Sequence, residues 1–497
     1  MELGIDLGTG SVKAALYQRG ERVREASAPY SVQAPRAGWA EIDPAAWWAA
    51  TVQATREALG PHGAEVRALG LSGQMHGVVL SDARGEPLRP AILWADTRAA
   101  QDLGAYEALP PELRSSLRNP VTTGLAGPTL LWLRGHEPEA YRAARWALQP
   151  KDWLRLHLTG EAHAEPSDAS ATLLYDPERD DWHWSLLDRL GLRSDLLAPL
   201  VPTRSRAGGL RPGVARELGL PAGLPVAAGG ADTAVALLGT GVPVGQVQLT
   251  VGTGAQLVVR GEALPEARRS LHVFREARDR GWYTLAAVQN AGIALEWARR
   301  ALRCDWPEFY ALAQAAEPGS RGLIFLPYLT GERTPHLNPH ARGGWVGAGL
   351  EHDARHLARA AFEGVALAIA DAAVGLPSTT RPEIRLAGGG SVHPWWRQLL
   401  ADALARPLVT VDVANASVYG ATLLAEAVAD GRDLREPAWP PGERIEPRPD
   451  SLGDEVRERF RAAYETLRSW FMSGSIRDAG IGNTPDHPSR RRFPDRQ

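Results

Sequence analysis

Asp6 stands beside a glycine-rich turn, in a position suited to phosphate chemistry. It is followed closely by Gly8-Thr9-Gly10-Ser11. Glycines let backbone N–H groups approach phosphate oxygens, and the Thr9 and Ser11 hydroxyls are additional donors. Because Mg²⁺ prefers oxygen ligands and retains waters, we expect Asp6 to hold this ion beside a phosphate, with Lys13 neutralising phosphate charge. A tight hairpin carrying a solvated aspartate is the alternative.

A second aspartate, Asp232, follows Gly229-Gly230 and precedes a run of small residues. A carboxylate at such a junction between strand and helix is well placed to act as general base for a hydroxyl nucleophile. We expect the start of the helix to help keep this carboxylate ionised. An ordinary N-cap aspartate is the alternative interpretation.

Two further glycine-rich segments are suited to contact a nucleotide. Gly252-Thr253-Gly254 repeats the first turn without its aspartate. We therefore expect the first turn to bind phosphate together with a metal ion, and the second to bind phosphate alone. Gly388-Gly389-Gly390 precedes an expected helix, where glycines permit a flat ligand or a phosphate to lie on the backbone. Close packing between strand and helix also explains these three consecutive glycines.

A short polar segment between Gly73 and Gly77 suits a polyol; it consists of Gln74, Met75 and His76. The thioether packs on a carbon chain, while the amide and the imidazole hydrogen-bond to hydroxyl groups. A later segment supplies further aromatic and polar lining through Trp94, Asp96 and Arg98. A lone histidine more often has a structural role, which is the alternative interpretation.

These residues must be positioned by strands that end in turns. Leu3, Ile5 and Leu7 alternate with other residues, which predicts a half-buried strand over residues 2–7. Residues 12–17 form the expected return strand. The pattern of strand, Gly-Thr-Gly and strand recurs at 247–259.

Each half of the chain also contains a later strand that runs into glycines, at 224–230 and at 384–390. Together with the two Gly-Thr-Gly turns, this suggests an internal duplication in which the first half carries an insertion. Chance recurrence of glycine-rich turns is the alternative. The predicted boundary lies near residues 239–245.

Helical patterns separate the strands and favour an α/β chain. Asp43-Pro44 is typical of a helix N-terminus, and Gly60-Pro61 ends that helix. We expect its inner face to be formed by Trp48, Val52 and Leu59. A second helix is predicted by apolar residues at helical spacing, namely Leu357, Ala361, Val365 and Ile369.

Composition argues against several classes of protein. With 55 basic and 58 acidic residues the formal net charge is −3, so no attraction to nucleic acid or anionic membrane is expected. Cys304 is the single cysteine, which excludes an internal disulfide and a cysteine-based zinc site. Lys13 and Lys151 are the only lysines and neither follows a glycine, so no GxxxxGK[ST] phosphate loop is present.

The ends and the apolar stretches are consistent with a protein that is neither secreted nor membrane-bound. The first ten residues lack the features of a signal peptide. The uncharged stretch 233–259 contains proline, glutamines and glycines that argue against a membrane span. Residues 474–497 are rich in Gly, Pro, Arg and Asp, and we expect them to be disordered.

The motifs along residues 1–470, taken in order, resemble those of the FGGY carbohydrate kinases, and within that family the xylulokinase-like members. They are GIDLGTGSVKAAL, GWAEIDPAAWW, LSGQMHG, RPAILWADTRA, PKDWLRLHLTGE, AGGADTA, LTVGTGA, LPYLTGERTPHLNPHARG and LAGGGSVHPWWRQLLAD. QMHG is the part that separates these members from glycerol kinase-like ones.

The resemblance implies an α/β fold of duplicated ribonuclease-H-like domains, as in actin-like ATPases, with ATP in a cleft between two lobes. Residues 1–240 would bind the sugar, and residues 241–470 the nucleotide. Met75 and His76 would contact the sugar, Asp6 would be the metal-side aspartate and Asp232 the catalytic base. Residues near the nucleotide would include Thr9, Ser11, Lys13, Gly252, Thr253, Gly388 and Gly389.

The implied reaction is ATP-dependent phosphorylation of D-xylulose to D-xylulose 5-phosphate with Mg²⁺, in the cytoplasm. The resemblance is also compatible with a homodimer. The family usually has asparagine directly after the catalytic aspartate, where this chain has Thr233. A kinase for another pentulose or polyol is therefore one alternative. An actin-like or chaperone-like ATPase is another, although it gives no reason for QMHG, and the presence of both carboxylates argues against a catalytically inactive sugar-binding regulator.

Overall fold

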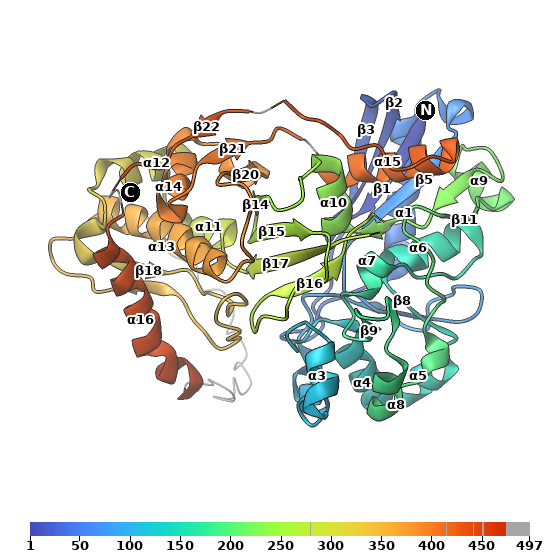
Figure 1. Ribbon diagram of the computed structural model, residues 1–497, viewed down its shortest axis with the longest axis horizontal. Helices are drawn as coiled ribbons and strands as arrows, with labels where there is room; N and C mark the ends of the chain where they lie inside the picture. Colours follow the sequence, from blue (N-terminus) through green and yellow to red (C-terminus); the bar gives the residue numbers. More distant parts are fainter. Residues whose placement is uncertain (279, 414, 441, 450–451, 474–497) are drawn as a thin grey trace, which may run out of the picture.

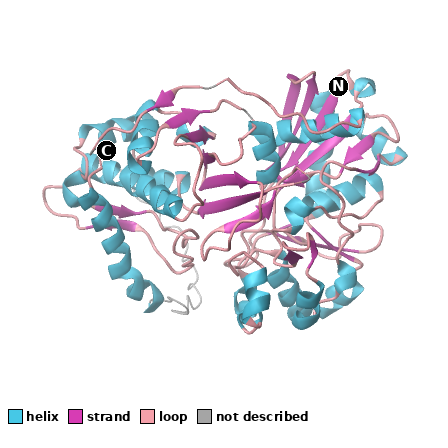
Figure 2. Cartoon of the chain, in the orientation of Figure 1, coloured by secondary structure: helices cyan, strands magenta, loops and turns pink. Residues whose placement is uncertain are grey.

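The computed structural model describes residues 1–278, 280–413, 415–440, 442–449 and 452–473. Figures 1 and 2 show two α/β lobes, one holding the N-terminus and the other holding the long helix near the C-terminus. This arrangement confirms the predicted fold class of two lobes with mixed sheets. The predicted disordered tail, residues 474–497, lies outside the described residues.

The sheet of the first lobe has β1 at its centre. Its strand order is β11 (Arg206–Gly209), β12 (Pro225–Ala227), β5 (Ala68–Gly73), β1 (Glu2–Leu7), β2 (Ser11–Gln18) and β3 (Glu21–Pro29), and β13 (Gly230–Ala231) also pairs with β5. β1 is antiparallel to β2 and parallel to β5. The Gly-Thr-Gly turn thus joins β1 and β2 into a hairpin, as predicted.

β1 is buried on both faces, so the prediction of a half-buried strand is wrong. Leu3, Ile5 and Leu7 lie in the same apolar core as Trp47 of helix α1 (Pro44–Leu59). The opposite face is covered by α15 (Ala416–Asp430), which comes so close that a Cβ on Gly4 would lie 2.4 Å from a carbonyl oxygen of that helix. The alternation in the sequence reflects this close approach and not exposure to solvent.

The second lobe repeats the central part of the first sheet. Its strand order is β16 (His272–Arg275), β17 (Trp282–Val288), β15 (Ala255–Gly261), β14 (Val247–Val251), β20 (Ile384–Ala387), β21 (Leu408–Thr410) and β22 (Arg444–Ile445). β14 is antiparallel to β15 and parallel to β20, as β1 is to β2 and β5. The predicted duplication is therefore confirmed at the level of strand order.

One pairing within that duplication needs correction. The strand before Gly388 is β20, and its counterpart by position is β5, which ends at Gly73, because each is the parallel neighbour of its lobe's first strand. The strand near Gly229, by contrast, lies one place further out than β5. Glycine-rich ends recur in the sequence, but only the pairing register identifies which strands are equivalent.

The predicted helices are present, with one change of face. Asp43 caps α1 by accepting a hydrogen bond from Ala45 N, and Gly60 follows its last residue. The innermost aromatic residue is Trp47, fully buried, whereas Trp48 is only partly buried. α13 (Ala354–Val374) buries the predicted apolar positions, of which only Leu357 keeps some exposure.

The predicted insertion lies between β5 and β11. It contains β6 (Val79–Ser81), β7 (Ala91–Ile92), α2 (Gly104–Glu107), α3 (Pro111–Ser116), α4 (Ala126–His136), α5 (Pro138–Ala143), β8 (Trp146–Leu148), α6 (Pro150–Thr159), α7 (Pro166–Ala169), β9 (Tyr175–Asp176), β10 (Asp181–Trp182) and α8 (Trp184–Leu190). The remaining helices of the two lobes are α9 (Pro212–Leu218), α10 (Asp232–Thr240), α11 (Gly292–Ala301), α12 (Trp306–Ala315), α14 (Pro394–Leu404) and α16 (Asp454–Ser473). No helix in the described ranges is long and apolar enough to cross a membrane.

Candidate active site

Three neighbouring strands of the first sheet end at the same edge. Asp6 of β1 is in register with Ser72 of β5, and Ser72 is in register with Gly230 of β13. All three strands are parallel, so the residues that follow them emerge together, and such strand ends are the usual ligand-binding edge of α/β sheets. Asp6 and Asp232 are thus separated by one intervening strand, a spacing of about 10 Å between outer strands.

Asp6 is held by two hydroxyl groups from opposite ends of the chain. Its two carboxylate oxygens accept hydrogen bonds at 2.7 Å from Ser72 Oγ and from Ser417 Oγ. Ser417 belongs to α15, on the segment that returns from the second lobe. Neither serine was identified from the sequence, because nothing local marks a serine as the partner of a distant carboxylate.

Asp232 is the first residue of α10 and accepts a hydrogen bond from the backbone N–H of Thr233 at 2.6 Å. Burial and the nearby Asp6 charge raise its pKa to about 7. The helix start favours the ionised carboxylate as expected, because the Thr233 contacts lower the pKa, but burial and the Asp6 charge raise it by more. A carboxyl group with a pKa near 7 is well matched to general base catalysis at neutral pH.

Met75 and His76 meet strands of the second lobe. The Met75 sulfur lies 3.9 Å from the hydroxyl oxygen of Tyr283 on β17, and the His76 ring lies 5.9 Å from that of Phe274 on β16. The Asp232 charge also acts on Tyr283. The predicted sugar-side residues and the predicted base therefore surround one region at the junction of the lobes.

The His76 ring is oriented by its backbone and by one hydrogen bond. Its φ is 71°, and Nδ1 lies 2.8 Å from the carbonyl oxygen of Ala171. Burial, with a contribution from Arg333, lowers its pKa to about 4. The ring is neutral at pH 7, with Nδ1–H donating to Ala171 and Nε2 left as an acceptor.

Gln74 and Trp94 both contact the first phosphate turn. Gln74 Nε2 donates to the carbonyl oxygen of Gly8 at 3.1 Å, and Trp94 Nε1 donates to Thr9 Oγ1 at 3.0 Å. The Arg333 guanidinium of the second lobe lies 5.5 Å from the centre of the Trp94 ring, within cation–π range. Sequence reasoning missed Arg333, although it stands in the GERTPH motif.

Arg333 brings a positive charge to this junction, where the neighbouring Glu332 carboxylate acts on it electrostatically. Within the described part of the chain its guanidinium forms no ion pair, and its charge lowers the pKa of both His76 and His272. Because this partly buried guanidinium has no ion pair among the described residues, it is available to bind an oxygen-rich ligand.

Asp96 and Arg98, predicted to line the sugar site, are bonded to each other. Arg98 Nη2 and Asp96 Oδ2 form a 2.7 Å ion pair, and Arg98 also pairs with Glu41 at 2.6 Å. The guanidinium stacks 3.6 Å above the Trp39 ring. The structure therefore gives both residues contacts that fix the loop carrying Trp94.

The two Gly-Thr-Gly turns occupy matching places in the two sheets and are largely exposed. A Cβ on Gly10 would meet nothing within 4 Å, so ligand atoms have room at that backbone. Lys13 Nζ, in register with Asp6, donates to Asn415 Oδ1 at 2.8 Å. The turn at 252–254 lies against the start of α11, where Ile293 N donates to Thr253 O at 3.0 Å.

The three glycines at 388–390 divide between packing and open space. A Cβ on Gly388 would lie 2.4 Å from Val251 O, whereas a Cβ on Gly389 would meet nothing within 4 Å. Close packing therefore explains Gly388, and the open space at Gly389 leaves contact with a ligand there as a prediction. Exposed Ile293 and Trp297 on α11 add an apolar surface near the second turn.

Comparisons with known proteins agree with this geometry. Residues 1–239 match the N-terminal domain of the FGGY family of carbohydrate kinases, and residues 247–429 match its C-terminal domain. The chain is 39% identical over 409 residues to a xylulose kinase of Escherichia coli (strain K12), covering 81% of this chain and 84% of that one.

Solved structures give the same result for the fold. A xyloylose kinase from Brucella ovis is 34% identical with a TM-score of 0.86, covering 94% of this chain and 99% of that chain. A gluconate kinase from Lactobacillus acidophilus is 25% identical with a TM-score of 0.88, covering 95% and 99%.

Proposed function

Because this chain belongs to the FGGY family of carbohydrate kinases, we propose that it transfers the γ-phosphoryl group of ATP to D-xylulose. The product is D-xylulose 5-phosphate. The observation that carries the proposal is the raised pKa of Asp232 at the edge where the polyol segment and the phosphate turn of β1 meet.

In this reaction the Asp232 carboxylate takes the proton of the terminal sugar hydroxyl as the hydroxyl oxygen attacks the γ-phosphorus. Met75 packs on the sugar carbons, and the neutral His76 accepts a hydrogen bond from a sugar hydroxyl through Nε2. The Arg333 guanidinium, which faces this region, supplies positive charge for sugar or phosphate oxygens. Positioning and electrostatic stabilisation account for most of the catalysis in phosphoryl transfer.

The residues around Asp6 fit a divalent metal. One carboxylate and two serine hydroxyls form an oxygen-rich group, and Mg²⁺ is commonly held by one or two carboxylates with waters and phosphate oxygens completing its shell. When bound, the ion offsets charge on the phosphates. Backbone amides of the turns at 8–10 and 252–254, with Gly389 and Lys13, bind phosphate oxygens of ATP.

A sugar acid is the second candidate acceptor. Among the described residues Arg333 forms no ion pair, which favours an anionic substrate, and the similar Lactobacillus acidophilus protein is a gluconate kinase. Thr233, with a single short hydroxyl beside the base, gives a further reason to examine the acceptor.

The test is a panel of acceptors assayed with Mg²⁺ and ATP by ADP release. The panel contains D-xylulose, L-xylulose, D-ribulose, L-ribulose and D-gluconate. We expect the highest kcat/KM for D-xylulose and its loss in Asp232→Ala, with unchanged thermal unfolding. A preference for gluconate that disappears in Arg333→Gln would favour the second candidate, and ATP hydrolysis unaffected by any acceptor would contradict both.

A further inference from the structure

Behind the strand ends lies a group of five buried charged side chains, here called the ionic cluster: Lys151, Asp152, Arg155, Glu165 and Asp168. None has a side chain more than 1% exposed. Lys151 Nζ lies 2.5 Å from Asp152 Oδ1, 3.2 Å from Glu165 Oε1 and 3.4 Å from Asp168 Oδ2. Buried ion pairs seldom stabilise a fold more than apolar packing does, and fixing geometry is their better attested role.

The ionic cluster anchors both ends of the loop that precedes Asp232. Arg155 Nη1 donates to the carbonyl oxygen of Ala228. At the other end, Ala231 N donates to Ser167 Oγ at 3.0 Å. The loop 228–231 is therefore tied at its first and last residues to groups on α6 and α7.

Ser167 transmits the anchor from a carboxylate to the backbone. Its hydroxyl donates to Glu165 Oε1 at 2.8 Å while its oxygen accepts from Ala231 N. Glu165 Oε1 is also the oxygen that faces Lys151 Nζ. A continuous path of hydrogen bonds and ion pairs thus runs from the ammonium group to the residue before Asp232.

The loop is also held by the pairing of β13 with β5 and by a 2.9 Å hydrogen bond from Ala228 N to Ser205 O, but its own residues are intrinsically flexible. Its centre is Gly229-Gly230, and Gly229 has a φ of 81°, in the region that glycine adopts freely. A Cβ on Gly229 would lie 2.7 Å from the Leu71 carbonyl oxygen, so no bulkier residue can stiffen this position. The anchors through Arg155 and Ser167 therefore add to the pairing of β13 with β5 in fixing the backbone that leads into Asp232.

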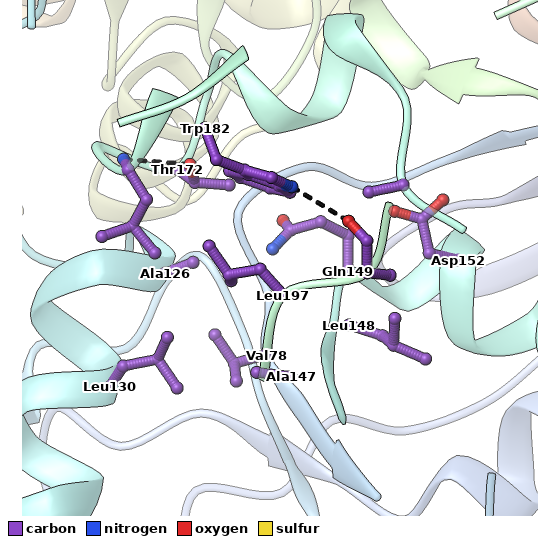
Figure 3. A pocket seen from close by; sticks show the side chains of 13 residues that line it. Val78, Ala126, Leu130, Ala147, Leu148, Gln149, Asp152, Thr172, Trp182 and Leu197 are labelled. Carbon is purple, nitrogen blue, oxygen red and sulfur yellow. Dashed lines mark hydrogen bonds between the residues drawn. The ribbon is translucent and has the colours of Figure 1, made fainter. Parts of the chain in front are cut away.

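The ionic cluster is not itself a ligand site. Gln149 and Asp152 border a small internal cavity, seen in Figure 3, with a volume of about 10 Å³. This space is comparable to one water molecule and far too small for a sugar or a nucleotide.

We propose that Ser167 is a positioning residue for phosphoryl transfer, which fixes the Asp232 carboxylate through Ala231 N with the ionic cluster as its rigid support. The inference rests on the proposed function, in which Asp232 is the base. A misplacement of about 1 Å in such a group can cost on the order of a hundredfold in rate.

Ser167→Ala tests the proposal, and Thr203→Val is the matched control. Thr203 Oγ1 donates to Glu165 Oε2 at 2.7 Å and is buried. Its methyl group, which valine retains, lies beside Gly230, but among the described residues its hydroxyl forms no hydrogen bond to loop 228–231. Each variant removes one hydroxyl donor from the same carboxylate, and Ser167→Ala also removes the acceptor of Ala231 N, so we expect a decrease in Tm in both variants and a larger one in Ser167→Ala. We expect kcat to fall about tenfold in Ser167→Ala with the sugar KM within about twofold, and to stay unchanged in Thr203→Val. Ser167→Cys, with a weaker donor, should have an intermediate kcat, and it carries the test if Ser167→Ala does not fold.

A double-mutant cycle with Asp232→Asn separates positioning from general damage. If Ser167 acts through Asp232, Ser167→Ala should not lower the residual rate of Asp232→Asn any further. An equal fractional loss in both backgrounds, an unchanged kcat in Ser167→Ala, or an equal loss in Thr203→Val would overturn the proposal. Failure of the proposed function would be recognised differently, since the parent enzyme would then not phosphorylate D-xylulose or would not depend on Asp232.

Discussion

Replacing Asp232 by asparagine should stabilise the protein while it abolishes the reaction. Burial and the Asp6 charge raise the pKa of the Asp232 carboxyl group, so its ionised form is disfavoured in the folded state. Asparagine has nearly the same shape, keeps an oxygen to accept the Thr233 N–H, and carries no charge. The folded variant therefore avoids a cost that the parent protein bears at neutral pH.

The size of the effect follows from the pKa. The Asp232 carboxyl group has a pKa of 3.8 in the unfolded chain and about 7 in the folded protein. The free energy of unfolding therefore decreases as the pH rises from about 4 to about 7. If the whole shift in pKa contributes, ionisation of Asp232 lowers the free energy of unfolding by about 4 kcal/mol at pH 8 and by about 1.6 kcal/mol at pH 5. Because the Asp232 side chain keeps some solvent contact, we expect about 2–4 kcal/mol at pH 8.

Urea unfolding of the parent protein and of Asp232→Asn at pH 5 and pH 8 measures this difference. The variant should be more stable at both values, with a clearly larger gain at pH 8. The gain in stability from Asp232→Asn should be smaller when it is measured in an Asp6→Asn background, because the Asp6 charge is one cause of the raised Asp232 pKa. If Asp232→Asn gave no gain in stability, or a gain independent of pH, the argument that ionised Asp232 destabilises the folded protein would be refuted.

Three other changes test separate parts of the site. The kcat/KM for the sugar should rise about tenfold per pH unit below pH 7 and level off above it, because Asp232 must be ionised to accept a proton; a flat profile from pH 5.5 to 8 contradicts this. Arg333→Gln should raise the pKa of His76 from about 4, which NMR titration of the ring detects, and an unmoved titration would show that the two groups do not interact. Gly388→Ala should lower stability by about 1–3 kcal/mol in urea unfolding, because its φ is 95° and the new Cβ would lie 2.4 Å from Val251 O; a parent-like midpoint would count against that close approach.

Local patterns in the sequence predicted local structure well. The Asp43-Pro44 cap, the hairpin around the first Gly-Thr-Gly turn and its copy near residue 253 all require only a few neighbouring residues, and the structure contains each of them. The junction that carries Asp232 was also recognised, because glycines followed by a helix leave a clear local pattern.

Features made by distant parts of the chain were not predictable in the same way. The Asp6 partner Ser417 lies 411 residues away, and the Arg333 contact with Trp94 joins the two lobes. Asp96 and Arg98 were predicted as polar lining from their residue types, but their ion pair depends on the turn that brings the two side chains together. The pKa of Asp232 likewise depends on burial and on another strand, which outweigh its own helix.

The helix α15 gives the chain an unusual order of assembly. It covers one face of the first sheet, where Gly4 and Gly70 each leave no room for a side chain beneath it, although it is encoded after most of the second lobe. During synthesis, that face of the sheet stays uncovered until residue 430 has left the ribosome. Residues 1–240 produced alone would present a bare apolar surface, and co-expression with a separate fragment that contains 416–430 would be needed to restore a soluble first lobe.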